Sequence, residues 1–187
     1  DKLGKIKAIK RIRYTSPHPR DIDEDLLKVM VKHSNICNQI HLPLQAGSSR
    51  ILKRMNRTYT KEEFLDLVDM IRTYIPDCGL STDIIVGFPG ETEEEFQETL
   101  EVVSKVKFDT AFMFKYSARP GTKASHYTDH ISEDIKQSRL QTLIEFQHNI
   151  SLMNNRKRIG LNLDVVIEKE SKKSANQWAG RIESNTW

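Results

Sequence analysis

The sequence has only two cysteines, Cys37 and Cys78, in 187 residues. Two cysteines are too few for a disulfide framework, and they do not form a C-x-x-C pair. The six histidines also lack the spacing of a metal-binding motif. We therefore predict no metal site in this chain and expect a cytoplasmic protein.

Long apolar runs are absent as well. No run approaches the roughly 18 residues that span a bilayer, and no signal peptide opens the chain, so we expect no integral membrane protein. Hydrophobic residues make up 37% and charged residues 29%, which is ordinary for a globular protein. The length suffices for one well-buried domain, or for one domain with a small appendage.

A strong overall charge is also missing, because the formal net charge is only +3. The charge is unevenly distributed, however. Residues 1–20 contain seven basic side chains and one acidic, residues 61–110 four basic and thirteen acidic, and residues 151–187 seven basic and four acidic. Basic ends around an acidic middle are compatible with a polyanionic partner, and equally with the solvated faces of ordinary helices and strands.

Strand-like runs alternate with helical patterns through most of the chain. The predicted strands cover residues 9–14, 39–44, 80–86 and 110–116. The predicted helices begin near residues 21, 49, 60, 92 and 132, the third and fourth of them with capping boxes at Thr60–Glu63 and Thr92–Glu95. Repeated strand–helix units predict an α/β fold with a parallel sheet and helices packed outside it.

The pattern changes after residue 158. Residues 161–169 and 178–182 resemble two strands of a small all-β element. We place a domain boundary there and predict units at 1–158 and 159–187. Two strands alone bury too little to be stable, and four parallel strands fall short of a closed barrel, so we expect a piece of a longer protein.

Ligands of parallel sheets gather at the carboxyl ends of the strands, so the loops there are the candidate sites. They contain small and polar residues at 16–18, 45–48, 87–91 and 117–122. Gln45 and Ser48 offer hydrogen-bonding groups, and Arg119 offers a positive fork. The segment 87–91 is no phosphate loop, because it lacks the Gly-Lys-Ser/Thr ending. His41 fits a hydrogen-bonded strand residue better than a ligand.

Five segments together resemble one family, the radical S-adenosylmethionine (SAM) methylthiotransferases. They are R-Y-T-S-P-H-P at 13–19, I-H-L-P-L-Q-A-G-S at 40–48, M-N-R-T-Y-T at 55–60, S-T-D-I-I-V-G-F-P-G-E-T at 81–92 and Y-S-A-R-P-G-T at 116–122. The resemblance covers nearly the whole chain. The tail, with Gly180 and Arg181, is similar to the start of a TRAM domain, the small β-barrel that these enzymes use on their substrate.

The resemblance implies a partial TIM-like (βα) barrel of the radical SAM type at 1–158, followed by part of a TRAM domain at 159–187. It also implies an enzyme that converts N6-isopentenyladenosine in tRNA to its 2-methylthio derivative. One SAM would be cleaved to a radical that attacks the adenine C2–H bond, and another would donate the methyl group. The segment Arg119–Thr122 resembles the tRNA enzymes more than the sister enzymes that modify a ribosomal protein.

Site residues follow from the same resemblance. Gln45 would contact the methionyl or ribose portion of SAM, Arg57 would pair with its carboxylate, and Asp83 would accept from its ribose hydroxyls. The full set that the resemblance implies is Gln45, Ser48, Arg57 and Asp83 for SAM, and Ser16, His18, Arg119 and Arg181 for the substrate.

The sequence departs from the family in its cysteines. The family holds its catalytic [4Fe-4S] cluster with a C-x-x-x-C-x-x-C motif and a second cluster in a separate N-terminal domain, and Cys37 and Cys78 match no ligand position of either. Because an iron–sulfur cluster needs its thiolates, we predict that this chain alone binds no cluster and is inactive. The sequence does not identify the sulfur donor.

Three other readings stay open. One is the ribosomal-protein aspartate methylthiotransferase, and another is an α/β enzyme of unrelated chemistry. The third is a non-catalytic RNA-binding module, with salt-dependent affinity and no need for SAM. It would use the basic N-terminal strand and a tail surface formed by Lys172, Lys173, Arg181 and Trp178.

Overall fold

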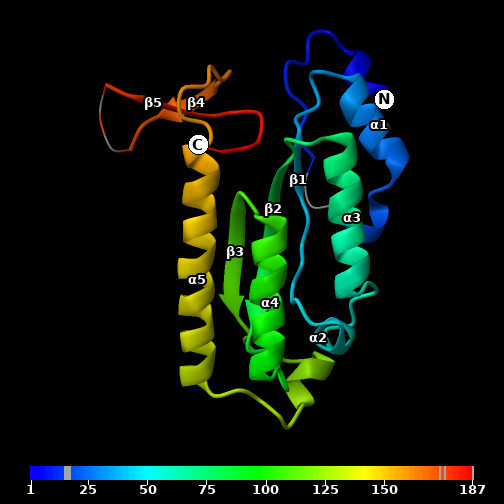
Figure 1. Ribbon diagram of the computed structural model, residues 1–187, viewed down its shortest axis with the longest axis vertical. Coiled ribbons are helices and arrows are strands. Elements are labelled where there is room, and N and C mark those ends of the chain that lie inside the picture. The colour runs from blue at the N-terminus through cyan, green and yellow to red at the C-terminus, as the bar shows by residue number, and fades with distance from the viewer. Residues whose placement is uncertain (15–17, 173, 175, 187) are drawn as a thin grey trace.

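The computed structural model describes residues 1–14, 18–172, 174 and 176–186 (Figure 1). Its central element is a parallel sheet in the order β1-β2-β3, formed by Gln39–His41, Gly79–Val86 and Thr110–Lys115. Gln39 lies opposite Gly79, and Ser81 lies opposite Thr110. The α/β fold with a parallel sheet is therefore confirmed.

Five α-helices connect and flank these strands. They are α1 (Glu24–Lys32), α2 (Ser49–Arg54), α3 (Lys61–Tyr74), α4 (Glu93–Val106) and α5 (Glu133–Arg156), with short 3-10 turns at Leu3–Lys5, Pro19–Asp21 and Lys123–His126. Both predicted capping boxes are formed, because the Thr60 and Thr92 hydroxyls accept from the backbone amides of Glu63 and Glu95, whose carboxylates in turn accept from the backbone amides of Thr60 and Thr92. In the described part of the chain, no helix combines the length and apolar character needed to cross a membrane.

The helices cover one face of the sheet. Leu80, Thr82, Ile84 and Val86 of β2 are buried beneath them, and the alternate residues are only half-buried. On β3 the side chains of Phe112 and Phe114 are 51% and 54% exposed, on the face that the helices leave open. Because parallel sheets are normally covered on both faces, this open face fits a partial barrel whose interior other strands would close.

Two strand predictions were wrong in extent. The expected strand 9–14 is reduced to a single parallel bridge between Ile12 and Ile36, held by the Ile12 amide on Asn35 O at 2.7 Å. The expected strand 39–44 ends at His41. The Leu42 amide still donates to Ser81 O at 2.7 Å, but the Leu44 amide donates to the side-chain Oγ1 of Thr82 at 2.9 Å, so the backbone ladder is interrupted before the bridge between Gln45 and Ile84.

The tail forms an antiparallel pair, β4 (Val166–Glu170) and β5 (Trp178–Arg181), so the first of the two predicted tail strands starts later than expected. The pair lies at the amino ends of the central strands (Figure 1). Arg11 Nη1 donates to Arg181 O at 2.7 Å, Arg13 Nη2 donates to Ile182 O at 2.8 Å, and the Asn38 amide donates to Glu183 Oε1 at 3.1 Å. The domain boundary and the TRAM assignment stay predictions.

Candidate functional site

Gln45 lies where β1 would continue beyond its carboxyl end. Its backbone amide donates to Asp83 O at 2.8 Å, and its backbone carbonyl accepts from the Ile85 amide at 2.9 Å, so the loop after β1 is held against β2. The Ala46 amide donates to Leu44 O at 2.9 Å across Gln45, whose φ of 66° lies in the left-handed region. Strain of this kind in a non-glycine residue is typical of ligand-binding loops.

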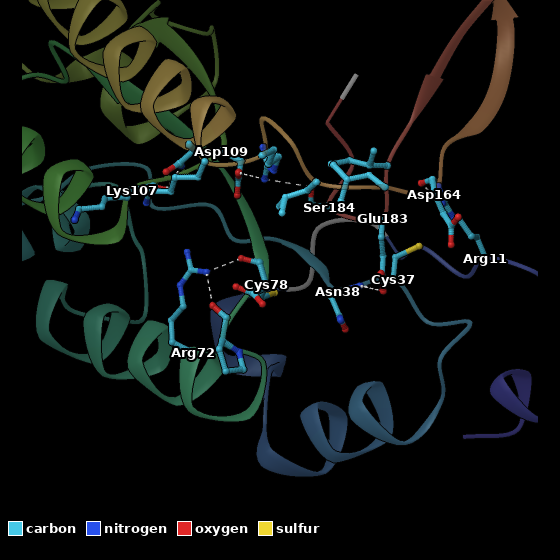
Figure 2. A pocket seen from close by; sticks show the side chains of 18 of the residues that line it. Arg11, Cys37, Asn38, Arg72, Cys78, Lys107, Asp109, Asp164, Glu183 and Ser184 are labelled. Carbon is cyan, nitrogen blue, oxygen red and sulfur yellow. Dashed lines mark hydrogen bonds and ion pairs between the residues drawn. The ribbon is translucent and has the colours of Figure 1, made fainter.

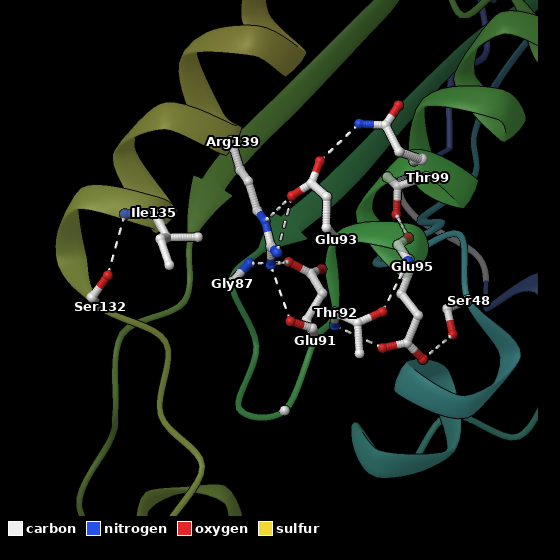
Figure 3. Close-up of polar contacts among 12 residues, drawn as sticks. Ser48, Gly87, Glu91, Thr92, Glu93, Glu95, Thr99, Ser132, Ile135 and Arg139 are labelled. Carbon is white, nitrogen blue, oxygen red and sulfur yellow. Dashed lines mark hydrogen bonds and ion pairs between the residues drawn. The ribbon is translucent and has the colours of Figure 1, made fainter.

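Ser48 ties this loop to α4. Its hydroxyl caps α2 and donates to Glu95 Oε1 at 2.8 Å (Figure 3). Arg50 donates to the same carboxylate at 2.7 and 2.6 Å. Burial alone would raise the pKa of Glu95, but the hydrogen bonds from Arg50, the Thr92 amide and Ser48 lower that pKa to about 2. The Ser48 hydroxyl is therefore already used inside the protein, and its contact with SAM stays a prediction.

Asp83 lies on the open face of the sheet in a chain of polar side chains. His41 Nε2 is 3.2 Å from Asp83 Oδ2, and His41 Nδ1 is 3.0 Å from Ser81 Oγ. Gln39 Nε2 donates to Ser81 Oγ at 3.3 Å. Because an ionised Asp83 carboxylate can only accept, Nε2 is the donor of His41, and the Ser81 hydroxyl can then donate to Nδ1. In the neutral ring this order assigns the proton to Nε2, so His41 donates to Asp83 and fixes one carboxylate oxygen.

Arg57 is half-buried and follows α2. Its Nε is buried without a hydrogen-bond partner among the described residues. Nearby, the Tyr59 hydroxyl donates to Pro43 O at 2.8 Å; burial raises the pKa of Tyr59 to about 12, and the charge of Arg57 opposes that rise. A guanidinium whose Nε has no partner among the described residues is suited to an anionic ligand such as a carboxylate.

His18 also lies at this edge. Its ring meets the Tyr59 ring edge-to-face with centroids 5.6 Å apart, and its Nδ1 accepts from the Arg20 amide at 3.3 Å. Ser16 lies outside the described residues, so the structure gives its prediction no outcome. Sequence reasoning brought out His18 and missed Tyr59, whose only signal is an aromatic residue within the 55–60 motif.

The loop after β2 is clamped by α5. Glu91 Oε2 accepts from the Gly87 amide and from Arg139 Nη1, each at 2.7 Å (Figure 3). Burial raises the pKa of Glu91, and the Gly87 amide and Arg139 oppose that rise. Arg139 also pairs with Glu93 at 3.2 Å. Glu91 and Arg139 are 48 positions apart in the sequence, so no local pattern indicates their ion pair.

The loop after β3 carries Arg119, which is exposed. The turn here is closed by Thr122 Oγ1 donating to Arg119 O at 2.8 Å. At the start of this loop, the Tyr116 ring stacks on the His130 ring with centroids 6.1 Å apart. The Tyr116 hydroxyl is buried without a partner among the described residues. Aromatic and basic groups therefore border the carboxyl-end site on the side of β3.

The structure thus gathers His18, Gln45, Ser48, Arg57 and Asp83 at one edge of the sheet, with Arg119 in the neighbouring loop. Arg181 is the exception. It belongs to β5 at the amino ends of the strands, where its Nη1 donates to Asn185 Oδ1 at 3.0 Å. A role in substrate binding for Arg181 would therefore require a substrate that reaches both ends of the barrel.

The cysteines do not fit an iron–sulfur cluster. Cys37 and Cys78 are buried at the amino ends of β1 and β2, opposite the candidate site. Burial raises the pKa of Cys78 to about 12, which disfavours the thiolate that a cluster needs. Among the residues that the structure describes, no group of three or more His, Cys, Asp or Glu side chains could hold a metal ion.

Comparisons with known proteins show which sequences this chain is similar to. The chain is 47% identical over 185 residues to a tRNA-2-methylthio-N(6)-dimethylallyladenosine synthase of Methylacidiphilum infernorum, covering 99% of this chain and 40% of that protein. It is 49% identical over 177 residues to the synthase of Christiangramia forsetii, covering 94% of this chain and 37% of that protein. The chain thus spans about two fifths of the length of these curated relatives.

A solved structure and a family model extend the comparison. Coproporphyrinogen III oxidase from Escherichia coli, a radical SAM enzyme, superimposes with a TM-score of 0.59 and 25% identity, over 71% of this chain and 31% of that one. The model of the radical SAM superfamily matches residues 1–103, more than half of the chain and the part that holds Gln45, Arg57 and Asp83. The chain belongs to the radical SAM superfamily.

Proposed function

We propose that this chain is the SAM-binding part of the barrel of a tRNA methylthiotransferase, which adds a 2-methylthio group to N6-isopentenyladenosine. The observation that carries the proposal is the 47–49% identity with two synthases of that name over almost the whole chain. The segment Arg119–Thr122, which resembles the tRNA enzymes, supports the same substrate. A cytoplasmic location is part of this proposal.

SAM fits the residues at the carboxyl ends of the strands. The Arg57 guanidinium, whose Nε has no partner among the described residues, would receive the SAM carboxylate, and Gln45 would present its side-chain amide from the strained turn beside it. Asp83 would accept from the ribose hydroxyls with the oxygen that His41 leaves free. When bound, SAM supplies the radical and the methyl group of the reaction. The protein's own contribution here is to bind and orient.

Gln39 and Ser81 hold the His41 ring, and His41 Nε2 in turn holds one oxygen of the Asp83 carboxylate. A fixed carboxylate loses less conformational entropy when it binds a hydroxyl pair than a freely rotating one. His41 is therefore a positioning residue for Asp83. His41 carries no obvious signal in the sequence, because a histidine in a strand is commonly a hydrogen-bonded structural residue.

The described residues do not fit an iron–sulfur cluster. The prediction that this chain alone retains no cluster is tested by anaerobic reconstitution followed by assay of iron and sulfide. Stoichiometric retention of both would contradict it.

SAM binding tests the site directly. Calorimetry on the intact protein compares the wild type with Arg57→Ala and with the control Arg156→Ala, an exposed arginine in the last turn of α5. A charge-assisted hydrogen bond contributes about 1.5–3 kcal/mol, so Arg57→Ala is expected to weaken SAM binding roughly 10- to 150-fold. Equal affinities of Arg57→Ala and Arg156→Ala would refute the assignment.

The substrate is tested in cells. Deletion of the gene is expected to abolish 2-methylthio-N6-isopentenyladenosine in total tRNA, with accumulation of the unthiolated nucleoside, as measured by mass spectrometry. Persistence of the thiolated nucleoside would overturn the tRNA assignment and favour the ribosomal-protein enzyme.

A further inference from the structure

A large groove lies at the opposite end of the strands from the candidate site. It has a volume of about 950 Å³ and lies where the tail meets the amino ends of β1, β2 and β3 (Figure 2). Its walls come from the N-terminal segment, the ends of α4 and α5, and the residues around Ser184. The superfamily match and the proposed function assign it no role.

Basic side chains outnumber acidic ones among the residues that line the groove. Seven basic and four acidic side chains line it. One acidic group, Asp109, is neutralised by Arg158 Nη2 at 2.6 Å, and another, Glu183, accepts from the Asn38 amide. The basic groups therefore outnumber the acidic groups that are free to balance them.

The basic side chains divide into two kinds. Arg11, Arg72 and Arg158 hold the walls together: Arg11 Nη2 donates to Asp164 O at 2.9 Å, Arg72 Nη1 donates to Cys78 O at 2.7 Å, and Arg158 pairs with Asp109. A second kind projects without any hydrogen bond or ion pair to a described residue. These exposed side chains are Lys10, Lys105, Lys107 and Lys157.

The four lysines come from three separate parts of the chain. Lys10 belongs to the N-terminal segment, Lys105 and Lys107 to the end of α4, and Lys157 to the C-cap of α5. A site for a compact anion such as free phosphate would need several donors that converge on one point. An open groove of this volume does not bring donors together in that way. Charges spread along a groove instead match a ligand that carries a row of charges, as a nucleic acid backbone does.

We propose that this groove binds the phosphate backbone of RNA, and that it is a second contact surface for the tRNA substrate. The inference rests on the proposed function, which supplies the RNA. The groove and the candidate site lie at opposite ends of α5, whose 24 residues correspond to about 36 Å of helix. A folded RNA is long enough to contact both ends, whereas a single nucleotide is not.

The groove also gives a place to Arg181, which the structure puts far from the carboxyl-end site. Its carbonyl accepts from Arg11, so β5 forms part of the support of the groove wall. RNA bound there would contact the tail and the barrel together. Phosphate contacts of this kind position a nucleic acid and carry no sequence information, so base recognition is left to the carboxyl-end site.

The test is tRNA binding by the intact protein as a function of salt, measured by fluorescence anisotropy with labelled bulk tRNA. The variant Lys105→Gln/Lys157→Gln removes two exposed charges from the groove. The control Lys2→Gln/Lys28→Gln removes two exposed charges that do not line it. Each lost phosphate contact is expected to reduce the slope of log K against log salt by about one. The loss of affinity relative to the wild type is therefore about eightfold larger at 0.1 M salt than at 1 M salt.

The outcomes separate this inference from the proposed function. The groove variant is expected to lose affinity and about two units of salt slope while its SAM binding stays at the wild-type level. If the wild type and both variants bind tRNA with the same affinity and slope, the groove proposal is overturned and the proposed function stands. If the wild type binds SAM and no tRNA, both proposals fail.

Discussion

The Glu95→Gln substitution tests how the SAM-site loop is fixed to the helical layer. Glu95 is 7% exposed, and its carboxylate accepts from Ser48, from Arg50 and from the Thr92 amide at 2.9 Å. A glutamine keeps the shape of the side chain and removes its charge. We expect the variant to fold, because glutamine occupies nearly the same volume as glutamate. We also expect it to be less stable than the wild type at neutral pH.

The magnitude follows from the pKa. The native environment lowers the pKa of Glu95 from an ordinary 4.5 to about 2. Since one pKa unit corresponds to about 1.4 kcal/mol, the ionised carboxylate stabilises the native state by about 3 kcal/mol. Because the native pKa is the lower one, this contribution is complete above pH 4.5 and is lost as the pH falls toward 2. It is a large share of a typical stability of about 5–15 kcal/mol.

Urea unfolding followed by far-UV circular dichroism measures the effect. The free energy of unfolding of Glu95→Gln is expected to lie about 3 kcal/mol below that of the wild type at pH 7, with the difference shrinking below pH 4.5. Glu101→Gln, on the exposed surface of the same helix, is the matched control. Equal stabilities at pH 7, or a difference that does not change with pH, would refute the reasoning.

Two further predictions concern packing and a buried charge. Gly47→Ala is expected to lower stability by about 1–3 kcal/mol, because an added Cβ would meet the backbone of Thr99; an unchanged urea midpoint would show that the loop can move away from α4. Arg139→Met is expected to cost about 3–5 kcal/mol, because it leaves Glu91 buried without its cation. A loss no greater than that of the exposed control Arg156→Met would contradict the second prediction.

Local sequence signals predicted the helices well. The capping boxes at Thr60 and Thr92 place the starts of α3 and α4 at the predicted residues, because a cap is a contact between residues three positions apart. The same signals say little about pairing between strands. The segment 9–14 has strand-like composition, yet among the described residues it forms only the bridge between Ile12 and Ile36.

Side-chain pairs across the fold were beyond sequence reasoning. Asp83 was identified as a candidate, but its partner His41 lies 42 positions away, and Glu91 and Arg139 are 48 positions apart. No period of 2 or 3.6 residues links such positions, so only the register of the strands and the packing of α5 bring them together. The same holds for the lysines of the groove, which come from three segments.

The alternation of strands and helices, the two capping boxes and the motifs of the superfamily can all be predicted from the amino-acid sequence, because each is a property of neighbouring residues. The tertiary structure decided where those motifs meet. Parallel strands bring the loops that carry Gln45, Arg57 and Asp83 to one edge, and the return of α5 carries Arg181 and the basic tail to the other. Which residues share a site depends on strand direction and register, and these are fixed only when the sheet is formed.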